Sequence, residues 1–227
     1  MKLNGSIIIL VALGLLSCAS NSFLDGKPKE KGPLTGMIYD RDRQSVSSAK
    51  IQVFFPGVEK PLETQTDING RFSIAEAPYG SLKVTISKPL YETFSVDFPF
   101  TTQSQVLYAQ VIHRNSLVEL GTVALQTGEW EQARNLQKRA QILDPQYPDI
   151  VFLEVYILIH DEKYKEAVAR LEGLIQRSSG LYPAYLALVD IYEFKLKDIP
   201  FAVEALKKAL LIRSQPEWEE RLKKLES

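Results

Sequence analysis

The spacing of apolar residues changes once along this chain, near His113, and this change constrains the fold more than any other feature. Before it, apolar and polar residues alternate, which is typical of half-buried strands. After it, apolar residues recur at the spacing of amphipathic helices. The 227 residues therefore predict a multidomain chain, with an all-β domain over residues 34–112 followed by an all-α domain over residues 114–216.

The alternation before His113 recurs in short segments that turn signals such as Pro56-Gly57 separate. The segments include Met37-Ile38-Tyr39, Ile51 and Val53, Phe72 and Ile74, Leu82 to Ile86, Phe94 to Phe98, and Val106 to Ile112. Many short strands at this spacing are typical of a β-sandwich.

The clearest turn signal is Asp67-Ile68-Asn69-Gly70. Asn69-Gly70 fits a hairpin turn, and the Asp67 carboxylate can accept backbone N–H groups ahead of it as an Asx-turn. A calcium loop is the alternative for this motif. It is disfavoured because Arg71 and Ser73 follow where further ligands would be needed, and no Glu closes the loop.

Three motifs occur in order in this region. They are Gly36-x-Ile38-x-Asp40, then Thr66-Asp67-Ile68-Asn69-Gly70-Arg71-Phe72, then Pro78-Tyr79-Gly80-Ser81-Leu82. Together they resemble the carboxypeptidase regulatory-like domain, a transthyretin-like, seven-stranded β-sandwich. The resemblance implies a non-catalytic accessory module of the kind found fused to other envelope domains.

The helical region repeats with a period of 34 residues: Trp130 and Ala133 correspond to Tyr164 and Ala167. The second helix of a third unit matches at 35 instead, which predicts one extra residue in the turn near residues 196–200. This period resembles the tetratricopeptide repeat (TPR), and the resemblance implies a three-unit α-solenoid. Residues 217–227, with Leu222 and Leu225 among many charges, predict a helix that caps the stack.

In the tetratricopeptide family the first helix of each unit lines a concave face. Carried over by position, the partner-binding candidates are Val118, Leu125, Phe152, Tyr156, Ile159, Leu186, Asp190, Glu193 and Phe194. This face is apolar and aromatic with one acidic edge, which favours an apolar or helical peptide of another envelope protein. The alternative is that the C-terminal helix, the β-domain or a second copy covers the face.

The start of the chain has the layout of a secretory signal peptide, with Lys2 followed by a short apolar run over residues 6–16. Leu15-Leu16-Ser17-Cys18 resembles the bacterial lipobox, which implies cleavage after residue 17 and acylation of Cys18. Residues 18–33 then predict a lipidated cysteine and a flexible tether. These features predict a membrane-anchored envelope lipoprotein, at the periplasmic face of the outer membrane or at the cell surface.

Composition narrows the function. Lys and Arg number 27 against 28 Asp and Glu, so nucleic acid is not an expected partner. With two His and one Cys, we expect neither a metal site nor a cofactor nor an enzyme. His160-Asp161 is a possible acid–base or metal pair, but a solvated turn is the favoured interpretation.

These observations predict a lipid-anchored, non-enzymatic scaffold or adaptor that binds an envelope protein or peptide through the concave helical face. The alternative is a lipoprotein that binds glycan or cell wall through its β-domain. An aromatic platform formed by Tyr39, Phe54 and Tyr79 is the candidate surface for that alternative.

Overall fold

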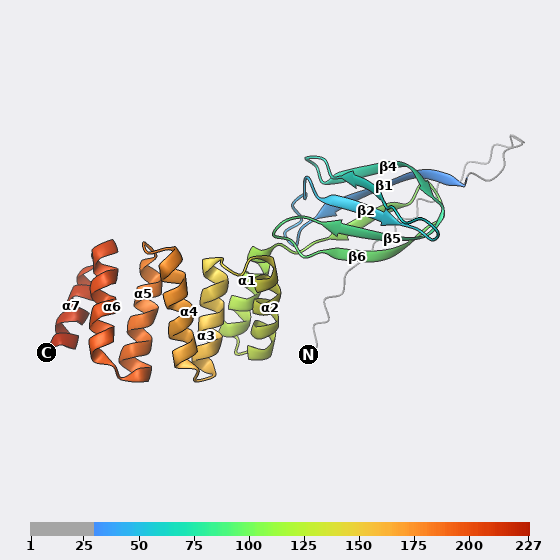
Figure 1. Ribbon diagram of the computed structural model, residues 1–227. Coiled ribbons are helices and arrows are strands. Elements are labelled where there is room, and N and C mark those ends of the chain that lie inside the picture. Colours follow the sequence, from blue (N-terminus) through green and yellow to red (C-terminus); the bar gives the residue numbers. More distant parts are fainter. Residues whose placement is uncertain (1–29) are drawn as a thin grey trace, which may run out of the picture. The chain divides into compact units, whose positions relative to one another are not determined.

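The computed structural model describes residues 30–227, in which seven strands precede the helices (Figure 1). They form two compact units that divide between residues 116 and 117. The predicted signal peptide and the predicted acylation of Cys18 lie outside the described residues. None of the helices between residues 30 and 227 combines the length and apolar character that crossing a bilayer requires.

The first unit contains seven strands in two sheets, as the alternation predicted. The strands are β1 (Lys31–Tyr39), β2 (Lys50–Phe54), β3 (Leu62–Gln65), β4 (Arg71–Pro78), β5 (Gly80–Ser87), β6 (Phe94–Phe100) and β7 (Val106–Gln110). One sheet has the order β4-β1-β7 and the other has the order β3-β2-β5-β6. Strand β3 has no fully buried side chain, so alternation did not reveal it.

Side chains from both sheets meet in one apolar core. Its largest fully buried members are Leu34, Ile38, Ile51, Leu82, Ile86, Phe98, Phe100 and Leu107. Gly36 lies opposite Leu107 in the parallel pairing of β1 with β7. A Cβ atom on Gly36 would overlap the Phe72 ring, so this position of the core has room only for glycine.

The turn at Asp67 has the predicted Asx geometry, but it does not close a hairpin. Asp67 Oδ1 accepts the backbone N–H groups of Asn69 and Arg71, both at 2.8 Å. The turn joins β3 of one sheet to β4 of the other, and these two strands are not paired. The hairpin prediction was therefore wrong, because a turn motif specifies local backbone geometry but not the partner of the strand that follows it.

The second unit consists of successive helices that begin with α1 (Figure 1). They are α1 (Arg114–Gln126), α2 (Trp130–Leu143), α3 (Pro148–His160), α4 (Tyr164–Arg177), α5 (Tyr182–Asp190), the π-helix η1 (Ile191–Leu196), α6 (Ile199–Ile212) and α7 (Pro216–Glu226). The predicted helical repeat is confirmed: α1–α2, α3–α4 and α5–α6 are three successive pairs, and α7 follows them.

A left-handed residue occupies the same place in the turn within each helix pair. Gly128, Glu162 and Lys197 have φ values of 76°, 60° and 57°, and the second helix starts two residues later in every unit. The turn of the third unit is therefore no longer than the other two. The extra residue lies instead in η1, where Asp198 N–H reaches the Tyr192 carbonyl at 2.8 Å. A π-helical turn accommodates one inserted residue within a helix.

Small residues let neighbouring helices approach, as the repeat pattern predicted. A Cβ atom on Gly121 in α1 would collide with the Leu153 side chain of α3. Ala133, Ala167 and Ala202 are fully buried at equivalent places in α2, α4 and α6. Helix α7 packs Trp218, Leu222 and Leu225 against the apolar core formed by α3 to α6.

Candidate functional site

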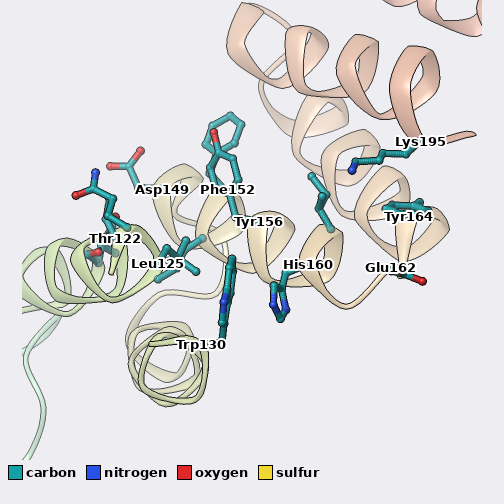
Figure 2. A pocket seen from close by; sticks show the side chains of 14 residues that line it. Thr122, Leu125, Trp130, Asp149, Phe152, Tyr156, His160, Glu162, Tyr164 and Lys195 are labelled. Carbon is teal, nitrogen blue, oxygen red and sulfur yellow. Dashed lines mark hydrogen bonds between the residues drawn. The ribbon is translucent and has the colours of Figure 1, made fainter. Parts of the chain in front are cut away.

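A cavity of about 860 Å³ lies along α1 and α3 (Figure 2). Its apolar lining residues are Val118, Leu125, Trp130, Phe152, Leu153, Tyr156, Ile159 and Tyr164, and its polar lining residues are Thr122, Gln126, Asp149, His160, Glu162 and Lys195. We call this cavity the groove. Its size and apolar lining are those of a ligand site.

A second cavity of about 360 Å³ continues the groove toward α5. The two cavities share Phe152, Tyr156 and Ile159 on α3. Leu186 and Asp190 line the second cavity from α5. One surface thus extends across the first helices of all three pairs.

The candidates from the sequence fall into four groups. Val118 and Leu125 line the groove only, whereas the shared residues of α3 line both cavities. Leu186 and Asp190 line the second cavity. Glu193 and Phe194 line neither of these two cavities. They lie beside α7, where Arg221 forms an ion pair with Glu193 and lies over the Phe194 ring at 5.4 Å.

One aromatic side chain of the groove, that of Tyr156, is largely open to solvent. Tyr156 is 59% exposed, whereas Val155, its neighbour on α3, is buried in the helical core. Helix α3 therefore has an inner face that packs against other helices and an outer face that carries a large aromatic ring. A large exposed ring in an apolar groove is typical of an interaction site.

Trp130 and His160 form one wall of the groove. Their rings stack with centroids 3.6 Å apart and an angle of 20° between the planes. Repeat spacing predicted Trp130 only as a packing residue between units. The sequence signal for its place in the groove is that it begins α2 directly after the turn at Gly128, as Tyr164 begins α4.

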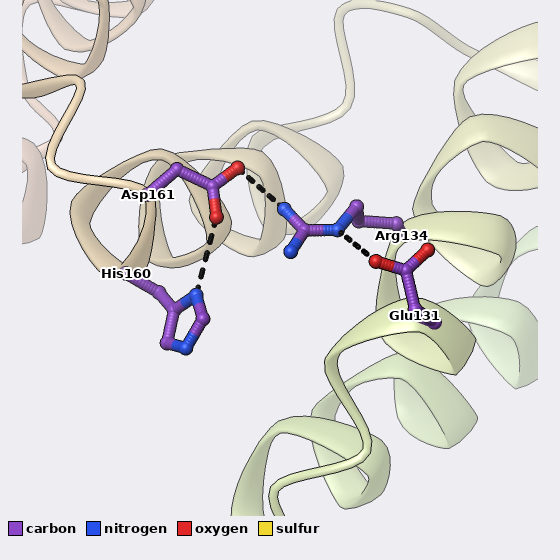
Figure 3. A network of polar contacts seen from close by, with 4 residues as sticks. All are labelled: Glu131, Arg134, His160 and Asp161. Atoms are coloured by element: carbon purple, nitrogen blue, oxygen red, sulfur yellow. Dashed lines mark hydrogen bonds and ion pairs between the residues drawn. The ribbon is translucent and has the colours of Figure 1, made fainter.

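His160 and Asp161 lie at the turn that follows α3, as we expected, and they form part of a polar network there (Figure 3). His160 Nδ1 lies 3.1 Å from Asp161 Oδ1, and Asp161 Oδ2 accepts a hydrogen bond from Arg134 Nη1. Arg134 Nε also donates to Glu131 at 3.2 Å. Asp161 follows the last residue of α3, so its side chain is free to turn back toward the ring.

This network keeps Asp161 ionised. Its hydrogen bond with His160 and then its hydrogen bond with Arg134 lower the pKa of the Asp161 carboxyl below the ordinary 3.8. The same hydrogen bond raises the pKa of Arg134. At neutral pH, the network therefore presents a carboxylate to His160 Nδ1.

Charged residues flank the apolar part of the groove, with Asp149 toward one end and Lys195 toward the other (Figure 2). Within residues 30–227, neither side chain forms an ion pair, although Lys195 Nζ lies 5.8 Å from the centre of the Tyr164 ring. The carboxylate of Glu162 likewise has no hydrogen-bond partner in this part of the chain. These groups can therefore interact with an occupant.

The proposed aromatic platform of the β unit does not form one surface. Tyr39 points outward from the three-stranded sheet and Phe54 from the four-stranded sheet, because each follows a buried residue of its strand. Tyr79 packs instead against Phe100, with ring centroids 4.9 Å apart. Strand alternation could not show that these rings belong to different faces.

The described chain also offers no metal centre: from residue 30 onward, no three His, Cys, Asp or Glu side chains gather where they could hold an ion. The residues that line the groove can make apolar contacts, hydrogen bonds and charge pairs.

No family model matches the sequence, and no curated protein sequence matches it. Several solved structures resemble the helical part of the fold. The TPR domain of OM64 from Arabidopsis is 19% identical, with a TM-score of 0.43 over 49% of this chain and 94% of that chain. The N-terminal domain of stress-induced protein-1 from C. elegans is 21% identical, with a TM-score of 0.44 over 50% of this chain and 94% of its own.

A third similar structure is the first TPR of Spaghetti (RPAP3), bound to the HSP90 peptide SRMEEVD. It is 17% identical, with a TM-score of 0.45 over 50% of this chain and 90% of that chain. The repeat itself rests on the three helix pairs and the equivalent turns of this chain.

Proposed function

We propose that this protein is a non-enzymatic scaffold whose helical unit, a tetratricopeptide-type array, binds a peptide segment of another envelope protein. The observation that carries the proposal is the groove with its exposed Tyr156, continued by the second cavity toward α5. A surface that crosses three helix pairs suits an extended or helical segment better than a compact small molecule.

The charges of the groove favour a particular kind of segment. An apolar face would contact Phe152 and Tyr156, while a basic side chain would meet Asp149 and an acidic one would meet Lys195. Opposite charges at the two ends would also fix the direction in which the segment lies, because charge complementarity contributes more to specificity than to affinity.

Synthetic amphipathic peptides test this proposal. Three helical peptides share one apolar face and carry Lys at both ends, Glu at both ends, or Lys at one end and Glu at the other. Fluorescence anisotropy with the full chain should give the tightest binding for the mixed-charge peptide. The gain per charge should be about two- to fivefold, as for exposed ion pairs.

Substitutions locate the binding surface. Phe152→Ala combined with Tyr156→Ala should weaken binding of the mixed-charge peptide by tenfold or more, because buried aromatic anchors dominate such interfaces. Leu211→Ala is the matched control, since Leu211 is an exposed apolar residue of α6 that lines neither cavity. Asp149→Lys should shift the preference to the peptide with Glu at both ends.

Two results would contradict the proposal. One is that none of the three peptides binds. The other is that sedimentation shows a dimer that Tyr156→Ala converts to monomer, which would make a second copy the occupant.

We also propose that the β unit is a carboxypeptidase regulatory-like module and that acylation of Cys18 anchors the chain at the periplasmic face of the outer membrane or at the cell surface. Seven strands in two sheets and the Asx-turn at Asp67 support the module. The lipobox-like ending of residues 15–18 supports the anchor.

Metabolic labelling with an alkyne fatty acid tests the anchor. The wild-type chain should incorporate the label and fractionate with membranes, whereas Cys18→Ser should do neither. Unchanged membrane association of Cys18→Ser would refute the anchor and leave the peptide-binding proposal to its own test.

A further inference from the structure

One ring nitrogen in the wall of the groove has no partner. His160 Nδ1 bonds to Asp161, but within residues 30–227 His160 Nε2 makes no hydrogen bond. The ring is held on one side by its stack with Trp130 and at Nδ1 by the carboxylate (Figures 2 and 3). The side chain is still 38% exposed, so Nε2 can be reached from the groove.

The partner of Nδ1 determines the tautomer of this histidine. An ionised carboxylate only accepts hydrogen bonds, so the atom facing Asp161 Oδ1 has to carry a proton. In a neutral imidazole, the other nitrogen then has a free lone pair. Arg134 reinforces this arrangement because it holds the second oxygen of Asp161.

We propose that His160 Nε2 is a hydrogen-bond acceptor with a fixed tautomer, and that it selects partner segments with a donor beside Trp130. This inference rests on the proposed peptide-binding function. The donor is an N–H or O–H group in a side chain of the bound segment. Arg134, Glu131 and Asp161 act as positioning residues, since they contact the ring or its carboxylate and not the occupant.

A segment without a donor at this position binds less well. Its apolar groups would remove water from Nε2 and leave the lone pair of this atom without a hydrogen bond. An acceptor in the segment would instead place its own lone pair against that of Nε2. A single net hydrogen bond corresponds to roughly three- to tenfold in affinity. His160 therefore adds specificity to a groove whose affinity comes from aromatic contacts.

Nitrogen NMR tests the tautomer without any ligand. The chain has only two histidines. His113 is an internal control, because we expect it to have the opposite tautomer. His113 Nδ1 accepts the backbone N–H of Asn115 at 3.2 Å, so neutral His113 carries its proton on Nε2.

At about pH 8, well above the ordinary pKa of an imidazole, the ¹⁵N spectrum of the full chain should show one histidine of each tautomer. His160→Gln should remove the resonances of the Nδ1–H form. Two histidines with their protons on Nε2 would overturn the proposal.

Peptide binding tests the selectivity. In the mixed-charge peptide, Gln is placed at each groove-facing position in turn and compared with glutamate γ-methyl ester, which keeps the carbonyl group, has no donor and is larger by one methyl group. At one position the ester should bind about fivefold more weakly, and in His160→Leu this difference between the two peptides should vanish.

Asp161→Asn supplies the control for positioning. An amide can donate to Nδ1, which frees Nε2 to carry the proton, so this variant should lose or invert the preference for Gln. If the wild-type chain bound Gln and ester peptides equally at every position, the proposed selectivity would be wrong. The proposal that the groove binds a peptide would not be affected. A chain that binds none of the peptides would overturn both.

Discussion

Arg221 in α7 donates two hydrogen bonds to the same oxygen of Glu193, from Nε at 2.9 Å and from Nη2 at 2.6 Å. The same guanidinium donates to Asp190 at 2.7 Å. Burial opposes the charge on Arg221, but these two carboxylates raise its pKa overall. The capping helix thus neutralises the acidic edge of the third helix pair, and the open part of the concave face is the groove along α1 and α3 with the second cavity toward α5.

Arg221→Ala should lower the free energy of unfolding of the helical unit by about 1 kcal/mol, as expected for partly exposed, multiply hydrogen-bonded charges. Both tryptophans, Trp130 and Trp218, belong to this unit, so tryptophan fluorescence during urea unfolding reports on it. Arg221→Lys should recover only part of the loss, because an ammonium group lacks the planar geometry of a guanidinium. No change in either variant would mean that the ion pair does not stabilise α7.

Lys197→Gly should stabilise the same unit by roughly 0.5–1 kcal/mol. Lys197 has a φ of 57°, a backbone conformation in which a Cβ atom is strained and glycine is not. Lys138→Gly is the matched control, since Lys138 is exposed in the middle of α2 and glycine there should cost about 1 kcal/mol. If both variants lose stability equally, the left-handed turn is not present in solution.

Gly70→Ala should destabilise the β unit severely, by about 3 kcal/mol or more. Gly70 has a φ of 72°, and a Cβ atom there would overlap the Ile38 carbonyl oxygen of β1. Gly57 has a similar φ of 81° but no neighbour within 4 Å, so Gly57→Ala should cost only about 1 kcal/mol. Calorimetry of the two variants separates backbone strain from collision, and equal losses would exclude the collision with β1.

Acid should weaken the network around Asp161. The pKa of this carboxyl is lowered in the folded chain relative to the ordinary 3.8, so ionised Asp161 stabilises the fold fully above the unfolded pKa. The contribution disappears as the pH falls through the folded pKa. The stability difference between wild type and Asp161→Asn should therefore be constant near neutrality and shrink below about pH 4. A difference that grows on acidification would show the opposite sign of coupling.

Local patterns predicted the elements of this fold well. Alternation located six of the seven strands, and the 34-residue period located three helix pairs and their turns, because burial on one face of an element leaves a regular trace in the sequence. It missed β3, whose exposed and half-buried residues leave no such trace. The sequence also showed that the third pair has one extra residue, but it did not show that this residue lies in η1.

By itself, the sequence determined the two classes of domain, the repeat length, and the apolar residues of α1, α3 and α5 that line the two cavities. Only the tertiary structure decided which distant side chains meet: Trp130 with His160, Asp161 with Arg134, and Glu193 with Arg221. The physical reason is that periodicity records whether a residue is buried along its own element. A pair contact depends on how two elements dock, and nothing in the local spacing encodes that.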